Sequence, residues 1–342
     1  MEKKKVLLIY TGGTIGMIQD TSTGVLKPFD FSQINKEVPE LSKIDCHIDT
    51  ISFDQPIDSS NMHPDIWADL VRMIQEHYDY YDGFVILHGS DTMAYTASAL
   101  SFMIQNLGKP IILTGSQLPI GTIRTDGKEN LITAIEIASE YKGNEAVVPE
   151  VCIYFEYKLF RGNRTTKLSA NNFNAFASMN YPALAEAGVE IAFNKPFIKT
   201  GSAGKPEFFT DFENDIGILQ LHPGISKKHF RHFFQSPGLK AIILQSFGAG
   251  NAPSDDWFVD ELNKAKENGL VVLNITQCKS GAVTHGKYET SNAMINSGVV
   301  SGGDMTIEAA LSKLMYLLGK HENIDKVRSL LTTDLVGELS AS

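Results

Sequence analysis

Two segments of this chain share one design, an apolar run that ends in a turn rich in glycine and hydroxyl residues. Residues 6–10 read VLLIY and continue into TGGTIG at residues 11–16. Residues 84–87 read FVIL and continue into HGSDT at residues 88–92. In open α/β sheets, turns that follow parallel strands gather at the carboxyl ends of those strands, where ligands bind. The sequence therefore predicts a parallel sheet in which these two turns are neighbours.

Short β-rich runs alternate with longer helical patterns along the chain, which is typical of βαβ units. The predicted strands are nearly continuous Val, Ile and Leu, as expected for strands buried on both faces. They span residues 6–10, 83–87, 110–114, 151–155, 216–221, 239–245 and 271–276. The predicted helices span residues 64–78, 91–105, 128–141, 255–267 and 306–318.

A chain of 342 residues exceeds one ordinary core, and a prior of about one domain per 150 residues favours two domains. Residues 194–207 interrupt the alternation with closely spaced prolines and glycines, which is typical of a linker. We expect an α/β protein with mostly parallel sheets and flanking helices. Its larger N-terminal catalytic domain would span residues 1–193, its linker residues 194–215 and its smaller C-terminal domain residues 216–342.

Charge and cysteine content exclude several classes of protein. The net charge is −10 and the pI is near 5.4, with Lys and Arg scattered, so we expect no nucleic-acid partner. The sequence has an odd number of cysteines, and they lie far apart, at Cys46, Cys152 and Cys278. This distribution argues against a disulfide framework or a zinc site. No apolar run approaches about 20 residues, and residues 6–10 are too short for a signal peptide. We therefore expect a cytoplasmic protein with no membrane partner.

Thr14 is the candidate nucleophile, because the glycine turn presents its hydroxyl directly after a strand. A turn of this kind also serves as a tight-turn device or as a cradle for phosphate. The turn lacks the GxGxxG spacing of dinucleotide folds and the GK[ST] ending of phosphate-binding loops. Nucleotide binding is therefore disfavoured, although a non-catalytic binding module remains open if Thr14 only caps a helix.

Further polar side chains form candidate partners for Thr14. Ser90 and Asp91 lie in the second turn, where capping of the following helix is the alternative reading. Lys167 closes the segment RGNRTTK, which is otherwise a solvated basic loop. A threonine hydroxyl is a poor nucleophile unless a base takes its proton, and a lysine can belong to such a relay. Ser59 and Ser60 belong to another hydroxyl-rich loop, for which capping by Ser or Asn is again an alternative.

A metal site is not predicted. His229 and His232 are three residues apart, but they lack a nearby carboxylate or cysteine that would complete a ligand set.

Together these motifs resemble the bacterial-type L-asparaginase family. The resemblance rests on TGGTI at residues 11–15, DSS at 58–60, HGSDTM at 88–93, RTTK at 164–167 and GAGNAP at 248–253. AYTASAL at 94–100, RGNR at 161–164 and TQC at 276–278 are similar to its cytosolic type I branch. The motifs occur in order over nearly the whole chain. The resemblance implies the two-domain asparaginase/glutaminase-like fold.

The resemblance also implies hydrolysis of L-asparagine to L-aspartate and ammonia through a threonine acyl-enzyme, with no cofactor and no metal. Thr14 would attack the side-chain amide carbon. Ser90, Asp91 and Lys167 would move the proton, and Asp91 would also hold the substrate ammonium. Ser59 would contact the α-carboxylate, with Ser60 beside it.

The physical chemistry agrees, because a zwitterionic amino acid needs an acceptor for its ammonium and donors for its carboxylate. The tetrahedral oxyanion needs backbone N–H donors such as those of Gly13 and Ser90. The family further implies that Asn251 reaches the neighbouring subunit's site. The active unit would then be a homodimer, often paired into a homotetramer.

Three positions depart from the family pattern. Ser90 stands where many members have threonine, and the hydroxyl is retained. Val25 stands where a loop tyrosine usually contacts the nucleophile, and Thr21, Ser22 or Thr23 are alternative partners for Thr14. Gln245 stands where the type I branch often has an arginine for a regulatory asparagine site, so the charged clamp is missing unless Lys240 or Lys279 replaces it.

Three alternatives to an L-asparaginase are a glutaminase-asparaginase, an asparaginase-like component of a tRNA-dependent amidotransferase, and a non-catalytic module that binds an amino acid or nucleotide. An amidotransferase component of this kind normally carries additional domains, for which this chain has neither the length nor a basic face. Release of ammonia from asparagine separates an enzyme from a binding module.

Overall fold

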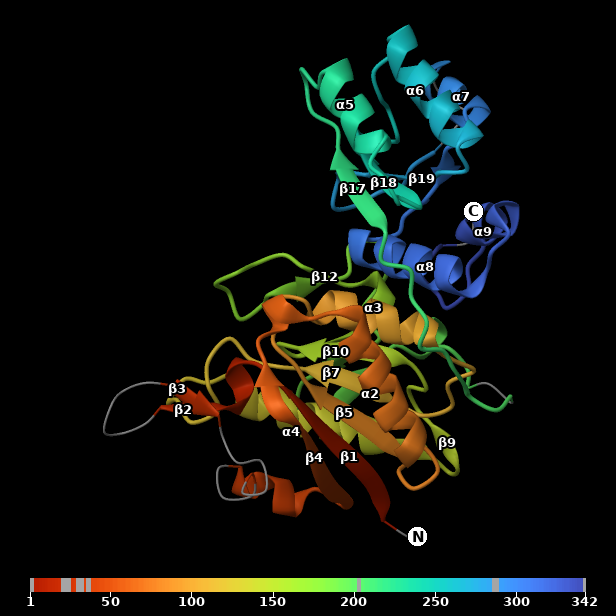
Figure 1. Cartoon of the computed structure of the whole chain (residues 1–342). Coiled ribbons are helices and arrows are strands. Elements are labelled where there is room, and N and C mark those ends of the chain that lie inside the picture. The colour runs from red at the N-terminus through yellow and green to blue at the C-terminus, as the bar shows by residue number, and fades with distance from the viewer. Residues whose placement is uncertain are drawn as a thin grey trace. The chain divides into compact units, whose positions relative to one another are not determined.

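The computed structural model describes residues 3–19, 26–28, 34, 38–201, 204–284 and 289–340. Its contacts divide the chain into two compact units, unit 1 (Met1–Thr210) and unit 2 (Asp211–Ser342). Figure 1 labels their helices and strands.

Unit 1 is built on an eight-stranded sheet in the order β15-β14-β11-β10-β7-β5-β1-β4. The five strands from β10 to β4 are parallel, and the remaining three continue the sheet in antiparallel pairs. The parallel strands are β1 (Lys4–Gly12), β4 (Cys46–Ile57), β5 (Gly83–Leu87), β7 (Ile111–Thr114) and β10 (Val151–Phe155). The antiparallel strands are β11 (Lys158–Arg161), β14 (Ala185–Ala187) and β15 (Ile191–Phe193).

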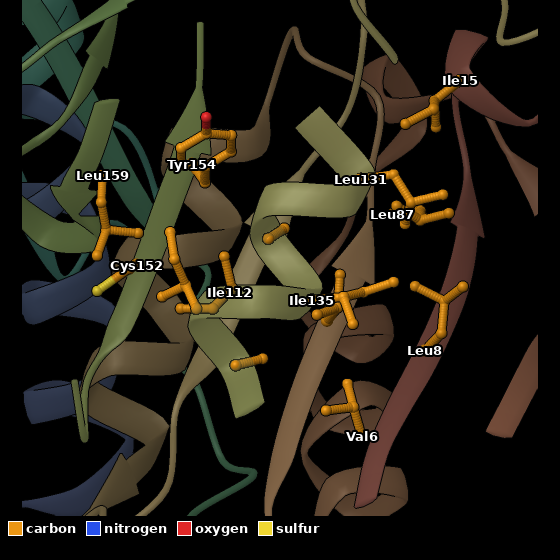
Figure 2. Packing of buried hydrophobic residues seen from close by; sticks show 14 of the residues in the cluster. Val6, Leu8, Ile15, Leu87, Ile112, Leu131, Ile135, Cys152, Tyr154 and Leu159 are labelled. Carbon is orange, nitrogen blue, oxygen red and sulfur yellow. The ribbon is translucent and has the colours of Figure 1, made fainter. Parts of the chain in front are cut away.

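Helix α4 (Gly127–Ser139) covers one face of this sheet. Alternate strand residues point toward it because successive side chains of a strand face opposite sides. Figure 2 shows the helix side chains Leu131 and Ile135 among Val6, Leu8 and other strand residues of this core. These four side chains are fully buried, and each contributes roughly 1.5–3 kcal/mol to stability.

Helices α2 (Pro64–His77) and α3 (Met93–Met103) pack together and cover the opposite face. Pro64 occupies the first turn of α2, where a missing N–H costs nothing, and the His63 ring accepts from the Asp65 N–H. Every residue of α3 except Tyr95 is buried. A helix that is buried all round is a core element, and the loop of residues 88–92 leads directly into it.

Short elements complete unit 1. The strand pairs are β2 (Met17–Gln19) with β3 (Leu26–Pro28), β6 (Ile104–Gln105) with β16 (Glu207–Phe208), β8 (Tyr141–Lys142) with β9 (Glu145–Ala146), and β12 (Thr166–Lys167) with β13 (Phe176–Ala177). The 3-10 turns are η1 (Thr14–Gly16), η3 (Pro39–Lys43), η4 (Ser59–Asn61), η5 (Gly162–Arg164) and η6 (Lys195–Phe197).

Unit 2 has a four-stranded parallel sheet with helices on both faces. Its strands are β17 (Ile216–Gln220), β18 (Ala241–Ser246), β19 (Val271–Thr276) and β20 (Val300–Ser301). An aromatic and aliphatic core joins the sheet to α5 (Lys227–Phe234), α6 (Asp256–Glu267) and α7 (Glu289–Asn296). Helices α8 (Ile307–Lys320) and α9 (Ile324–Leu331) contact the sheet as well.

The predicted α/β class is confirmed, and each predicted strand and helix is present with ends within two residues of the observed ones. The long strand β4 was not predicted. It is the edge strand next to β1, and most of its side chains are half-buried or exposed. An edge strand of this kind lacks the continuous apolar run by which the buried strands were identified.

Candidate active site

The two glycine turns are neighbours in the structure, as predicted. Strands β1 and β5 pair in parallel with Tyr10 opposite Leu87, so both chains leave the sheet at the same edge. The Thr11 hydroxyl donates to the Leu87 carbonyl at 2.9 Å. Gly13 has a φ of +87°, and a Cβ at this position would lie 2.6 Å from the Gly89 Cα. Only glycine permits both this backbone conformation and this close approach.

Thr14 begins the 3-10 turn η1 directly after Gly13 and is half-buried. The turn is closed by the Gly16 N–H, which donates to the Gly13 carbonyl at 3.2 Å. Beneath it, the buried Tyr10 hydroxyl donates to the Gly16 carbonyl at 3.2 Å. Burial raises the pKa of Tyr10 to about 12, so this hydroxyl stays protonated and remains a donor.

Lys167 joins two of the predicted site residues in the second turn. Its Nζ donates to Ser90 Oγ at 2.9 Å and to Asp91 Oδ1 at 2.7 Å. The Lys167 side chain is 16% exposed, whereas that of Asp91 is 68% exposed. The lysine arrives from β12, far along the chain, while the serine and aspartate precede α3. A hydroxyl, a carboxylate and an ammonium therefore form one connected group beside the turn that carries Thr14.

Ser59 and Ser60 occupy different environments in the third loop. Ser59 is buried and lies so close to Gly89 that a Cβ on Gly89 would be 2.5 Å from Ser59 Oγ. Its carbonyl accepts from the Thr92 hydroxyl at 2.7 Å, which ties this loop to the second turn. Ser60 is exposed, and its hydroxyl donates to Asp58 Oδ1 at 2.8 Å.

Asp58 supplies the capping group of η4, whereas the alternative reading of this loop assigned capping to Ser or Asn. Its carboxylate accepts from the Ser60 N–H at 2.9 Å as well as from the Ser60 hydroxyl. These hydrogen bonds lower the pKa of Asp58. Ser59 is thus the loop hydroxyl that lies against the second turn, and Ser60 serves the cap.

His88 was not predicted as a site residue, yet it is fully buried directly before Gly89. Its Nδ1 lies 2.7 Å from the Gly89 carbonyl oxygen, and its Nε2 lies 2.9 Å from Thr96 Oγ1. Burial lowers the pKa of His88 from 6.5 to about 4, so the ring is neutral at pH 7. A histidine between a buried strand and a polar turn is the sequence signal that marks it.

Acidification is expected to destabilise the protein through His88. Between pH 6.5 and pH 4 the unfolded chain binds a proton at this ring and the folded chain does not. The free energy of unfolding therefore falls as the pH decreases, by up to about 3 kcal/mol below pH 4, with no contribution above pH 6.5. The check is urea unfolding of the wild type and of His88→Asn, whose stability difference should shrink across this window. A difference that stays constant would contradict the assignment.

The other predicted positions belong to unit 2 or lie outside the described residues. Asn251 belongs to unit 2, where its N–H donates to the Phe247 carbonyl at 2.8 Å and Phe247 donates back to Asn251 at 2.9 Å. These two bonds form an isolated β-bridge, and Asn251 is half-buried. Gln245 is half-buried near the end of β18. Val25 and its alternatives at residues 21–23 lie outside the described residues.

Within the described part of the chain, no group of three or more His, Cys, Asp or Glu side chains converges to hold a metal ion. None of its helices combines the length and the apolar character that crossing a membrane requires.

Two family models match the sequence. The model described as "Asparaginase, N-terminal" matches residues 5–199. The model described as "Glutaminase/Asparaginase C-terminal domain" matches residues 215–331. Together they span most of both units.

Similar proteins match over nearly the full length. L-asparaginase 1 of Escherichia coli (strain K12) is 46% identical over 343 residues, which are 99% of this chain and 99% of that protein. The L-asparaginase of Thermococcus kodakarensis is 34% identical over 340 residues, which are 99% of this chain and 100% of that protein. The crystal structure of L-asparaginase I from Vibrio cholerae matches with a TM-score of 0.90 and 39% identity, covering 99% of this chain and 100% of that one.

Proposed function

The chain belongs to the asparaginase family, and from this premise we propose that it hydrolyses L-asparagine to L-aspartate and ammonia through an acyl-enzyme on Thr14. The observation that carries the proposal is the connection of Lys167 Nζ to both Ser90 and Asp91, in a turn whose Gly89 abuts Gly13. We assign this chemistry to unit 1, within the catalytic domain predicted over residues 1–193.

Substrate binding follows from the charges of a free amino acid. The contact with Lys167 engages Oδ1 of Asp91, and this side chain is exposed. Its other carboxylate oxygen, Oδ2, is therefore the acceptor for the α-ammonium. Ser59, which lies against the second turn, is the donor for the α-carboxylate. Ser60 contributes beside it only if its hydroxyl leaves Asp58. These anchors fix the distance from the amino-acid end of the substrate to Thr14.

The reaction is an acyl transfer with a proton relay. Thr14 Oγ1 forms a bond to the side-chain amide carbon, and its proton passes to Ser90 Oγ. Ser90 gives its own proton to Lys167 Nζ as Lys167 gives one to the Asp91 carboxylate. The proton returns to the amide nitrogen as the C–N bond breaks, which releases ammonia and leaves an ester on Thr14. Water then attacks the ester, with its proton taken by the same relay, to give aspartate and free Thr14. The oxyanion accepts hydrogen bonds from the Gly13 and Ser90 N–H groups.

The assembly and the location are part of the same proposal. A homodimer or homotetramer would bring Asn251 of one copy to the site of another, because the family resemblance assigns this residue to a neighbouring subunit. The three cysteines are free thiols, which suits a reducing cytoplasm. Sedimentation of the purified protein and fractionation of its host cells test these two points.

A coupled ammonia assay on the purified protein tests the proposed function. Free asparagine should release ammonia without added metal or nucleotide, and the rate should be the same with a chelator present. Loss of turnover in chelator that a divalent ion restores would contradict the cofactor-free mechanism. Binding of asparagine without any release of ammonia would indicate a non-catalytic binding module. Activity that requires a charged tRNA would instead favour a role in an amidotransferase.

Asparagine should be preferred over glutamine by about 10²-fold in kcat/KM. If Asp91 and Ser59 fix the amino-acid end, the additional methylene of glutamine moves its amide carbon off the line of attack from Thr14. A displacement on the order of 1 Å suffices for an effect of this size. The check is a full rate curve with each amide, and comparable kcat/KM values would favour a glutaminase-asparaginase.

The rate curve for asparagine should be close to hyperbolic because Gln245 offers no charged clamp to an effector carboxylate. A guanidinium makes two charge-assisted hydrogen bonds to a carboxylate, whereas a neutral amide makes one ordinary bond. Cooperative activation would need a coupling of typically about 1–3 kcal/mol between the two sites. Steady-state rates of the wild type and of Gln245→Arg test this point. A sigmoidal wild-type curve would show that another group, such as Lys240 or Lys279, binds the effector.

A further inference from the structure

A directed chain of hydrogen bonds runs from helix α2 to the second turn. The Trp67 indole N–H donates to Thr96 Oγ1 at 3.0 Å, and Thr96 Oγ1 lies 2.9 Å from His88 Nε2. His88 Nδ1 lies 2.7 Å from the Gly89 carbonyl oxygen. A carbonyl oxygen can only accept, so Nδ1 carries the ring hydrogen and Nε2 accepts from the Thr96 hydroxyl. Every group in the chain has one assigned direction.

The last bond of this chain fixes the orientation of one peptide plane. In a planar trans peptide, the carbonyl and the following N–H point in opposite directions. The Gly89 carbonyl points to the buried His88 ring, so the Ser90 N–H of the same peptide points away from it. The first turn lies against the preceding peptide, since a Cβ on Gly13 would lie 2.6 Å from Gly89 N and 3.0 Å from His88 C.

Because residue 89 is a glycine, the orientation of the Gly89–Ser90 peptide has to be fixed by a contact from outside the turn. A Cβ at this position would lie 2.5 Å from Ser59 Oγ, so a stiffer residue cannot replace it without displacing Ser59. Glycine leaves its backbone more free to rotate than any other residue does. The turn therefore combines a position that must be glycine with a peptide whose direction matters.

We propose that His88 is a positioning residue, which holds the Gly89–Ser90 peptide so that the Ser90 N–H faces the oxyanion of the reaction, and that Thr96 fixes the orientation of the ring by donating to Nε2. This inference rests on the proposed function, because it concerns a donor to the tetrahedral intermediate. His88 itself touches neither substrate nor nucleophile. Without the Thr96 hydroxyl, Nε2 loses this hydrogen-bond donor, and the orientation of the ring depends on its contact with the Gly89 oxygen alone.

Three variants and one control separate positioning from a general structural role. His88→Leu removes the donor and should lower kcat by about 10²-fold, the lower end of the effect of losing one oxyanion donor. Thr96→Val should lower kcat about fivefold, the factor for one neutral hydrogen bond. His88→Asn places an amide N–H near the position of Nδ1 and should restore most of the activity lost in His88→Leu. The control is Ser101→Ala, which removes a buried hydroxyl elsewhere on α3 and should leave kcat unchanged.

The readouts are kcat and KM measured separately, together with nitrogen NMR of the His88 imidazole. The KM for asparagine should change little, because Asp91 and Ser59 bind the ground state. The NMR spectrum should report the Nδ1–H tautomer in the wild type, and in Thr96→Val it should show a changed Nε2 shift, because this nitrogen has lost its hydrogen-bond donor. An Nε2–H tautomer in the wild type, or a folded His88→Leu that keeps more than about a third of kcat, would overturn the proposal. If His88→Leu does not fold, Thr96→Val decides, and an unchanged kcat there overturns it.

Failure of the proposed function would look different. A wild-type protein that releases no ammonia from asparagine refutes the asparaginase activity, whatever the variants do. An active wild type with insensitive variants refutes only the role of His88.

Discussion

Thr14→Ala and Lys167→Met are each expected to lower kcat for asparagine by at least about 10³-fold while the protein stays folded. The alanine variant has no atom that can form the acyl bond. The methionine variant keeps the length of the side chain but loses the nitrogen that lies 2.9 Å from Ser90 Oγ and 2.7 Å from Asp91 Oδ1. Members of a nucleophile relay act as a unit, so either loss removes most of the acceleration. Rates of ammonia release and circular dichroism of each variant are the measurements.

Two matched controls accompany these variants. Lys158→Met removes a lysine of the same unit that makes one long surface ion pair with Glu186, at 3.7 Å, and should leave kcat unchanged. Thr14→Ser keeps a hydroxyl at the proposed nucleophile and should retain measurable turnover. If Thr14→Ala or Lys167→Met keeps more than about a tenth of wild-type kcat, the assigned roles are wrong.

The central strands were predictable because burial on both faces leaves a continuous apolar run. Residues 83–87 are an example, since all five are buried and the predicted bounds agree with β5. The edge strand β4 carries polar residues such as Asp49 and Asp54, and its pattern resembles an irregular loop. Helix α5 is short and was not predicted, although Ser226 caps it and its buried residues Phe230 and Phe234 are four residues apart. Local composition therefore identified the core of each sheet better than its margins.

Sheet topology alone made one part of the candidate site predictable, namely the two turns that carry Thr14 and Ser90. Parallel strands put the turns after β1 and β5 at one edge, and this holds for Thr14 and Ser90. Lys167 has no such local signal, because a lysine in a basic loop looks the same whether it is solvated or turned inward. Its role came from the family resemblance, and the structure adds its contacts with Ser90 and Asp91.

The hydrogen-bond partners of His88 could not be predicted from the sequence. Its partners Thr96 and Trp67 lie on two different helices, and their convergence depends on how α2 and α3 pack. No spacing rule relates the three residues, since only tertiary packing joins them. The same limit applies to Asn251, whose proposed partner site belongs to another copy of the chain.

Lys313→Met lowers the free energy of unfolding of unit 2 by about 3–5 kcal/mol. Lys313 Nζ lies 2.6 Å from Glu338 Oε1, and neither side chain is exposed. The ammonium also donates to the Leu331 and Thr333 carbonyls at 3.1 and 2.6 Å, so it ties the segment after α9 to α8. Burial lowers the pKa of Lys313, although the neighbouring Glu338 opposes this shift. The variant leaves a carboxylate buried without its cation and two carbonyls without a donor.

Two comparisons make this second expectation specific, with urea unfolding followed by fluorescence of Trp257 in unit 2. Lys264→Met on α6 removes a half-exposed lysine that contacts Glu261, and should cost no more than about 0.5 kcal/mol. In Lys313→Met with Glu338→Gln no charge of this pair remains, and an amide oxygen at the position of Oε2 still accepts from the backbone N–H groups of Leu335 and Val336. The double variant should therefore be more stable than Lys313→Met alone. If it is not, the cost arises from lost packing rather than from an unpaired buried charge, and the ion pair does not hold the C-terminal segment in place.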